Sequence, residues 1–250
     1  MKRAATTRAE AGITLIEVLI SVTLLGFLTL AMLFAMRVGL SALQKADTKL
    51  MDNRRVAGAQ RVLEQQIAGF MPVKAVCASD PDAGPPPTIA FFQGEPQTMR
   101  MVSSYSLQEA WRGTPRLLEF QVIPGAEGKG VRLIVNESAY TGPLSAGRTC
   151  LGVILDPSTG LNIPQFRPIE ANAKSFVLAD KLAWCRFSYL EPEKAPELER
   201  WRNDWVLPRW PLGVRIDMAP LEDNPARLRP VSVTAAIRTN RAPDIDYADY

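Results

Sequence analysis

Few residues in this chain of 250 have side chains suited to catalysis or to metal binding. The chain contains no histidine, which excludes an imidazole base and a histidine-bound metal. Its serines therefore have no histidine to activate them as nucleophiles. The cysteines Cys77, Cys150 and Cys185 form no CxxC pair, so the spacing typical of a zinc site is absent. We expect a protein that is not an enzyme and that needs no cofactor.

Calcium is the one ion for which the sequence offers grouped ligands. Asp244, Asp246 and Asp249 lie close together in PDIDYADY, and carboxylate oxygens are ligands that calcium prefers. No glycine stands where a calcium-binding loop would turn. The favoured interpretation of residues 241–250 is a solvated acidic tail, with calcium binding as the alternative.

Glu17 is the residue whose surroundings do not match its chemistry. It stands in GITLIEVLIS, just before a stretch from Val18 to Met36 that carries no charge. As a helix this stretch would span about 28 Å at roughly 1.5 Å per residue, close to the hydrocarbon thickness of a bilayer, about 30 Å. An acid in a membrane helix costs roughly 3 kcal/mol at the bilayer centre and indicates a function by default.

The position of Glu17 after a glycine suggests what that function is. A chain cut after Gly12 would begin at Ile13 with a free α-amine, and Glu17 would lie about 6 Å from it along the helix axis. When such helices pack into a bundle, the carboxylate can pair with the amine of a neighbouring subunit. Because either charge alone is costly in apolar surroundings, the pair would set the axial register between subunits. Glu17 is therefore predicted to serve assembly.

The segments around Glu17 must hold it at a membrane. Residues 1–12 carry three basic side chains against one acidic one, and a basic leader keeps the N-terminus in the cytoplasm. A cleaved secretory signal would have a shorter apolar region, roughly 7 to 15 residues, ending in a small-residue cleavage site. We expect residues 13–36 to cross the membrane lipid once and everything after about Arg37 to lie outside the cytoplasm.

The helical pattern continues beyond the apolar stretch. Apolar residues recur at spacings of three, four or seven and charged residues fill the other face, which is typical of an amphipathic helix. The apolar positions are Leu43, Leu50, Val56, Ala59, Leu63, Ile67 and Phe70. This predicts one helix from about Ile13 to about Phe70, amphipathic over residues 37–72 and ended by Pro72.

The remainder of the chain favours antiparallel sheet. Residues 73–88, which include DPDAGPPPT, are predicted to form a stiff linker, and period-two patterns follow over residues 89–240. The predicted strands are Ile89–Phe92, Thr98–Ser104, Leu117–Ile123, Val131–Ser138, Cys150–Leu155, Ala183–Leu190, Gly213–Met218 and Val231–Arg238. The expected fold class is α+β, with one long N-terminal helix followed by a β-rich globular head.

Charge and cysteine content bear on partners and compartment. The net charge is only +3, too small and too evenly spread to indicate a nucleic-acid surface. A head outside the cytoplasm would be in an oxidising environment, where one disulfide is expected. Cys150 and Cys185 both lie in strand-like runs and are the predicted pair, which leaves Cys77 unpaired.

The run Gly12-Ile13-Thr14-Leu15-Ile16-Glu17-Val18 resembles the prepilin processing motif of type IV pilins and of the pseudopilins of type II secretion. The resemblance implies a pilin-like fold, cleavage after Gly12 by a prepilin peptidase, and N-methylation of Ile13. The first mature residue in that family is usually Phe, so Ile13 departs from the pattern, whereas Gly12 and Glu17 match it. The implied location is the bacterial inner membrane, with the head in the periplasm.

A second segment points to one branch of this family. Between Leu178 and Met218 the sequence resembles the C-terminal part of the J-type minor pseudopilin of the general secretion pathway. The matching features are Phe187-Ser188-Tyr189, the pair Trp201 and Trp205 with Trp210 beyond it, and Leu207-Pro208 before Val214-Arg215-Ile216. The resemblance implies a tip subunit that primes the periplasmic pseudopilus with other minor and major pseudopilins and the inner-membrane assembly platform. Tryptophans beside strands are more often core packing than recognition.

Three alternatives remain open. A minor pilin of a type IV pilus would use the same N-terminal chemistry and would differ in its partners. A membrane-anchored periplasmic enzyme would need a convergent polar site. A plain single-span anchor protein would tolerate Glu17→Val with unchanged function.

Overall fold

The computed structural model describes residues 14–78, 84–157, 160–191, 200–221 and 231–237, without the side chains of residues 45–57 and 127. The chain divides into two units, Met1–Met51 and Asp52–Tyr250. An apolar N-terminal helix is followed by an antiparallel β-rich head, so the α+β class is confirmed.

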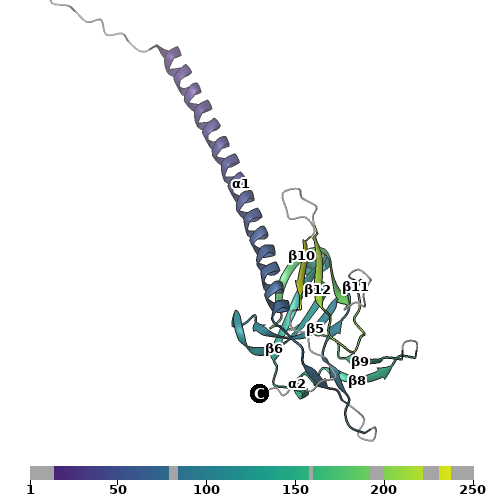
Figure 1. The fold of residues 1–250 in the computed structure, drawn as a ribbon. Helices are drawn as coiled ribbons and strands as arrows, with labels where there is room; N and C mark the ends of the chain where they lie inside the picture. The colour runs from purple at the N-terminus through teal and green to yellow at the C-terminus, as the bar shows by residue number, and fades with distance from the viewer. Residues whose placement is uncertain (1–13, 79–83, 158–159, 192–199, 222–230, 238–250) are drawn as a thin grey trace, which may run out of the picture. The chain divides into compact units, whose positions relative to one another are not determined.

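Nine strands of the described residues form the main sheet (Figure 1). All pairings in it are antiparallel, and the order is β1-β5-β6-β7-β10-β12-β13, with β4 also pairing with β5 and β11 with β10. The strands are β1 (Phe70–Met71), β4 (Gln93–Gly94), β5 (Thr98–Ser106), β6 (Trp111–Pro124), β7 (Val131–Ala139), β10 (Phe176–Glu191), β11 (Arg200–Arg202), β12 (Gly213–Pro220) and β13 (Val231–Ala236).

Two short ribbons lie outside this sheet. One pairs β2 (Lys74–Val76) with β3 (Thr88–Ala90), and the other pairs β8 (Cys150–Leu155) with β9 (Asn162–Phe166). A 3-10 turn, η1 (Ala126–Gly128), joins β6 to β7, and the short helix α2 (Pro143–Gly147) precedes β8. The predicted linker 73–88 is therefore wrong in part, because its two ends pair as strands β2 and β3.

Helix α1 (Leu15–Ala68) matches the predicted helix closely, but Pro72 does not end it. The helix ends four residues earlier, where Gly69 approaches β5: a Cβ on Gly69 would lie 2.7 Å from the Ser103 hydroxyl oxygen. Phe70 then pairs with Ser103 in the sheet. The chain leaves the helix because a strand partner is available there.

The last turns of α1 supply part of the core. Leu63 and Ile67 are fully buried and belong to one apolar cluster with Met99 and Met101, which alternate along β5. The residue between them, Arg100, lies on the opposite face, as a strand period of two requires. That face packs against a second cluster, Ala75, Phe91, Val102, Leu117 and Ala146. Strand β5 is therefore buried on both sides.

The tryptophans of the resemblance segment are mostly core residues. Trp205 and Trp210 are buried, and Trp205 forms an edge-to-face cluster with Phe92 and Tyr189. Gly94 is required beside them, since a Cβ there would lie 2.7 Å from Trp205 Cβ. Trp201 is half-buried beneath the Arg215 guanidinium, 3.9 Å from its ring centre. The core-packing interpretation of Trp205 and Trp210 is confirmed.

Candidate functional site

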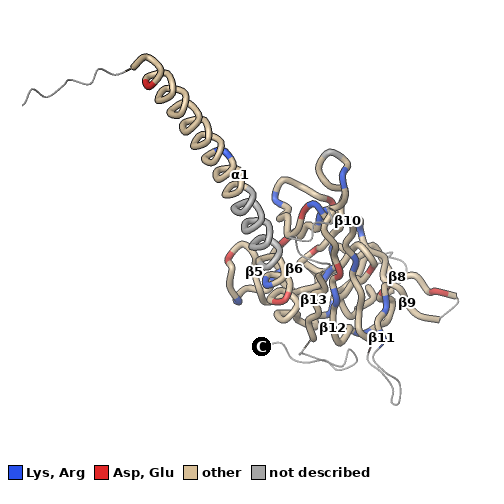
Figure 2. The backbone as a smooth tube through the Cα atoms, turned by 90° about the horizontal axis from the view of Figure 1, so that it is seen from above, with Lys and Arg blue, Asp and Glu red and all other residues tan. Residues whose placement is uncertain are grey.

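The N-terminal part of α1 is an apolar surface that the described chain leaves uncovered. Residues Leu15–Gln44 are long and apolar enough to cross a membrane, with a mean hydropathy of 2.5 and none of the most apolar stretch buried. Figure 2 shows the charge-free length of the helix in tan between one acidic and one basic position. Large apolar side chains such as Phe27 and Met32 are about three-quarters exposed, at 75% and 74%. An apolar surface of this extent is typical of a helix that contacts lipid or other apolar helices.

Glu17 lies in the first turn of α1. Its amide donates to the Thr14 carbonyl at 3.0 Å, and its own carbonyl accepts a hydrogen bond from the Ser21 hydroxyl at 2.7 Å. The side chain is exposed. The unpaired amides at a helix N-terminus carry partial positive charge, which favours a carboxylate in this turn.

The other predicted processing residues cannot be placed. Gly12 and Ile13 lie outside the described residues, as do Asp244, Asp246 and Asp249 of the calcium alternative. Among the residues that the structure describes, no group of three or more Cys, Asp or Glu side chains could hold a metal ion. Cleavage, methylation and the role of Glu17 stay predictions.

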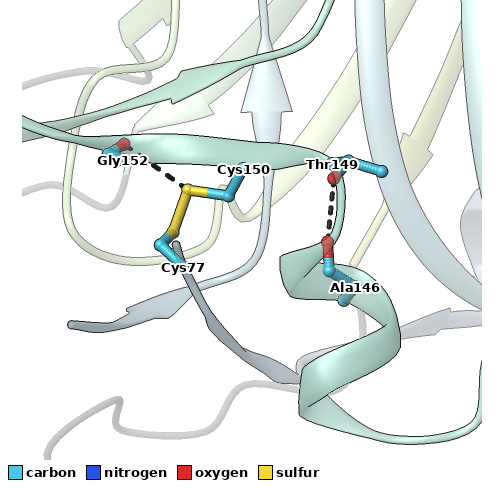
Figure 3. The surroundings of a disulfide bond; sticks show 5 residues. All are labelled: Cys77, Ala146, Thr149, Cys150 and Gly152. Carbon is cyan, nitrogen blue, oxygen red and sulfur yellow. Dashed lines mark hydrogen bonds between the residues drawn. A yellow bond between two sulfur atoms is a disulfide. The ribbon is translucent and has the colours of Figure 1, made fainter. Parts of the chain in front are cut away.

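The predicted disulfide between Cys150 and Cys185 is wrong. Cys150, at the start of β8, is bonded instead to Cys77, which follows β2, and the two Cα atoms are 5.1 Å apart (Figure 3). The prediction of Cys150 and Cys185 rested on the strand-like sequence around both cysteines. In the structure β8 lies in a separate ribbon, and Cys185 faces the main core on β10. Strand-like sequence does not reveal which sheet a strand joins.

Cys185 is a buried free thiol. Burial, with a smaller contribution from the carboxylate of Asp217, raises its pKa from 9.0 to about 12. A thiol with so little thiolate is a poor nucleophile and a poor metal ligand. We assign Cys185 to packing and not to chemistry.

Alkylation of the thiols tests this pairing. In the folded protein, without reductant, we expect no labelling by iodoacetamide at pH 9, because Cys185 holds roughly five hundredfold less thiolate there than a thiol of ordinary pKa. In denaturant, still without reductant, one thiol per chain should react, and peptide mass spectrometry should place it at Cys185. Labelling of Cys77 would contradict the observed pairing.

Sequence reasoning also missed two buried polar clusters. The side chain of Glu137 has no exposed surface and accepts hydrogen bonds from the Ser106 hydroxyl at 2.5 Å and the Leu107 amide at 2.6 Å, with Arg116 Nε 3.4 Å away. Arg100 is equally enclosed. The sequence did contain a signal for both clusters. In each case a charged residue occupies a position that the period-two pattern of its strand places on a buried face. Both clusters join segments that are distant in the sequence.

One open hollow lies on the outer face of β10, β12 and β13. It measures about 290 Å³ and is lined by polar side chains that include Arg186, Ser188 and Asp217, beside the ring of Trp184. Among the described residues that line it there is no thiol, and the only carboxylate is that of Asp217. No protein-family model matches the chain, and no curated protein is detectably similar to it.

Proposed function

We propose that this chain is a minor pseudopilin of a type II protein secretion system. In this scheme a prepilin peptidase removes residues 1–12 and methylates Ile13, and the mature protein then joins the tip of a short periplasmic filament and primes its formation. The observation that carries the proposal is the position of Glu17. It is the only acid in Thr14–Gln44, and it occupies the first turn of an exposed apolar helix, five residues after a glycine.

The chemistry of the helix supports assembly over simple anchoring. An anchor needs only the apolar length and has no use for an acid in its first turn. In a bundle of like subunits the carboxylate gains a partner, because processing creates an ammonium four residues before it. Such an ion pair forms at only one axial register between neighbouring helices. At any other register both charges would be unpaired in apolar surroundings.

The disulfide supports a head outside the cytoplasm. Disulfides persist in oxidising compartments and are rare in the cytosol, and Cys77 and Cys150 are bonded here across a sequence separation of 73. The three basic residues of the leader favour a cytoplasmic N-terminus. Together these features fit a single-pass protein of the bacterial inner membrane with its head in the periplasm.

The mass of the N-terminal peptide tests the processing step. In cells that contain a prepilin peptidase, we expect the mature protein to begin at Ile13 and to be heavier by one methyl group. Gly12→Val places a branched side chain at the cleavage point and should leave the leader attached, whereas Ala11→Val should be processed normally. A protein that retains residues 1–12 in cells with active secretion would contradict the proposal.

Deletion of the gene separates secretion from a type IV pilus. A pseudopilin predicts loss of exported enzymes from the medium with surface pili unchanged, and restoration by the wild-type chain. Loss of pili with normal secretion would favour the minor pilin of a type IV pilus.

A further inference from the structure

The ribbon of β8 and β9 exposes an unusual concentration of apolar surface. Leu151, Ile154 and Leu155 on β8 are 53%, 59% and 61% exposed, and Leu144 on the adjoining helix α2 is 73% exposed. Strand β8 reads CLGVIL and carries no charge. A two-stranded ribbon alone is only marginally stable in water, so this one must be held from its base.

The base of the ribbon is held by covalent and buried contacts. Cys150 is bonded to Cys77, which ties β8 to the end of β2 (Figure 3). Phe166 at the end of β9 packs edge-on against Phe91, with ring centres 5.9 Å apart. Arg100 Nη2 donates to the Arg167 carbonyl at 2.5 Å. Both strands of the ribbon are therefore anchored to the head at their base, and the exposed part of the ribbon is preorganised.

The hydrogen-bond pattern shows which edge of the ribbon is available. The Asp156 amide donates to the Leu161 carbonyl at 2.9 Å, which identifies these two residues as a hydrogen-bonded pair. Bonded and non-bonded pairs alternate along an antiparallel ladder. Counted along the ribbon from the bonded pair Asp156–Leu161, the pairs Leu155–Asn162 and Val153–Pro164 are therefore non-bonded. Residues in such pairs direct their N–H and C=O groups away from the partner strand.

The two edges consequently differ. On the β9 edge the outward positions are Asn162 and Pro164, and Pro164 in the middle of the strand has no N–H to donate, which disfavours further pairing along this edge. On the β8 edge Val153 and Leu155 present N–H and C=O groups, and within the described residues no strand pairs with them. Proteins normally protect such an edge with charge, proline or a bulge. In β8 the register shifts once, between Cys150 and Gly152, before the exposed part of the edge begins. From Val153 to Leu155 there is no such protection.

We propose that the outer edge of β8 is a strand-addition site for an extended, uncharged segment of another prepilin-type subunit. The inference rests on the proposed function for the identity of the partner. The main-chain groups of Val153 and Leu155 specify an extended segment, and the uncharged side chains around them specify an apolar one. Docking would cover part of the exposed side chains of Leu151, Ile154 and Leu155, which border this edge on the two faces of the ribbon.

Crosslinking in cells tests the site with the full chain. Benzoylphenylalanine in place of Leu155 should give an adduct with a different subunit that mass spectrometry identifies by its own prepilin-type N-terminus. The matched control places the same group at Val177, which is 51% exposed on β10, and we expect at least a tenfold lower yield there. No adduct, an equal yield at Val177, an adduct between two copies of this chain, or an adduct with a protein of another class would overturn the proposal.

A main-chain variant distinguishes strand pairing from nonspecific apolar contact. Val153→Pro removes one outward N–H and leaves the bonded pairs of the ribbon in place, as Pro164 already does opposite it. We expect at least a tenfold loss of the Leu155 adduct with the Cys77–Cys150 disulfide still formed. An unchanged yield would overturn strand addition. Processing at Gly12 and the dependence of assembly on Glu17 are measured in separate experiments. If both are observed but no adduct forms at Leu155, only the strand-addition site is contradicted and the proposed function stands.

Discussion

Glu17→Gln is expected to leave the protein inserted and processed but absent from filaments. The amide keeps the size of the side chain and its hydrogen-bonding ability, and it removes the charge that would pair with the terminal ammonium of a neighbour. That ammonium would then be a lone charge among apolar helices, and breaking such a pair costs about 3–5 kcal/mol. Incorporation and secretion should fall by at least about a hundredfold, since every 1.4 kcal/mol is a factor of about ten.

Quantitative blotting of sheared filaments and of the membrane fraction measures this effect. Glu10→Gln is the matched control, because it removes an acid of the leader, which is discarded on processing, and it should behave as wild type. Glu17→Asp keeps the charge on a side chain one methylene shorter, and it should retain part of the activity. If Glu17→Gln subunits entered filaments normally, the carboxylate would have no assembly role, and a plain membrane anchor would be the better interpretation.

Arg100→Met is expected to destabilise the head by about 3–5 kcal/mol, which is a large part of the stability of an ordinary domain. Arg100 is 1% exposed, and its Nε donates to Glu119 on β6 at 2.7 Å. It also donates to the side chain of Gln93 on β4 and to the Arg167 carbonyl beyond β9. Methionine fills the space and leaves these acceptors without their donor.

Urea unfolding of the full chain in detergent, followed by tryptophan fluorescence, measures this loss because Trp205 and Trp210 are buried in the core. Arg112→Met on β6 is the matched control: its side chain is exposed, and its effect should be within about 0.5 kcal/mol. The pair Arg100→Met with Glu119→Gln should recover part of the loss, since it removes the unpaired charge. A change below about 1 kcal/mol for Arg100→Met would show that the network contributes little.

The strands of the head could be predicted because their pattern is local. All eight predicted strands overlap observed ones, and Cys150–Leu155 has the predicted bounds. Strands β1, β2, β4, β9 and β11 were not predicted. Four of them have only two or three residues, too few positions to show a period of two, and the five-residue β9 contains Pro164, which argues against a strand. Prolines made residues 73–88 look like a linker, although the Cys77 amide donates to the Pro87 carbonyl at 2.9 Å and extends the pairing of β2 with β3.

The sequence alone determined the helix and its apolar length, the uncharged stretch after Glu17, and the existence of most strands. These depend on residues close together in the chain, whose periodicity and charge are visible without a fold. Only the tertiary structure decided that Cys77 bonds Cys150, that Arg100 joins β4, β5 and β6, and that β8 leaves the main sheet with one edge open. Such features depend on which distant segments become neighbours, and that choice is set by the packing of the whole core.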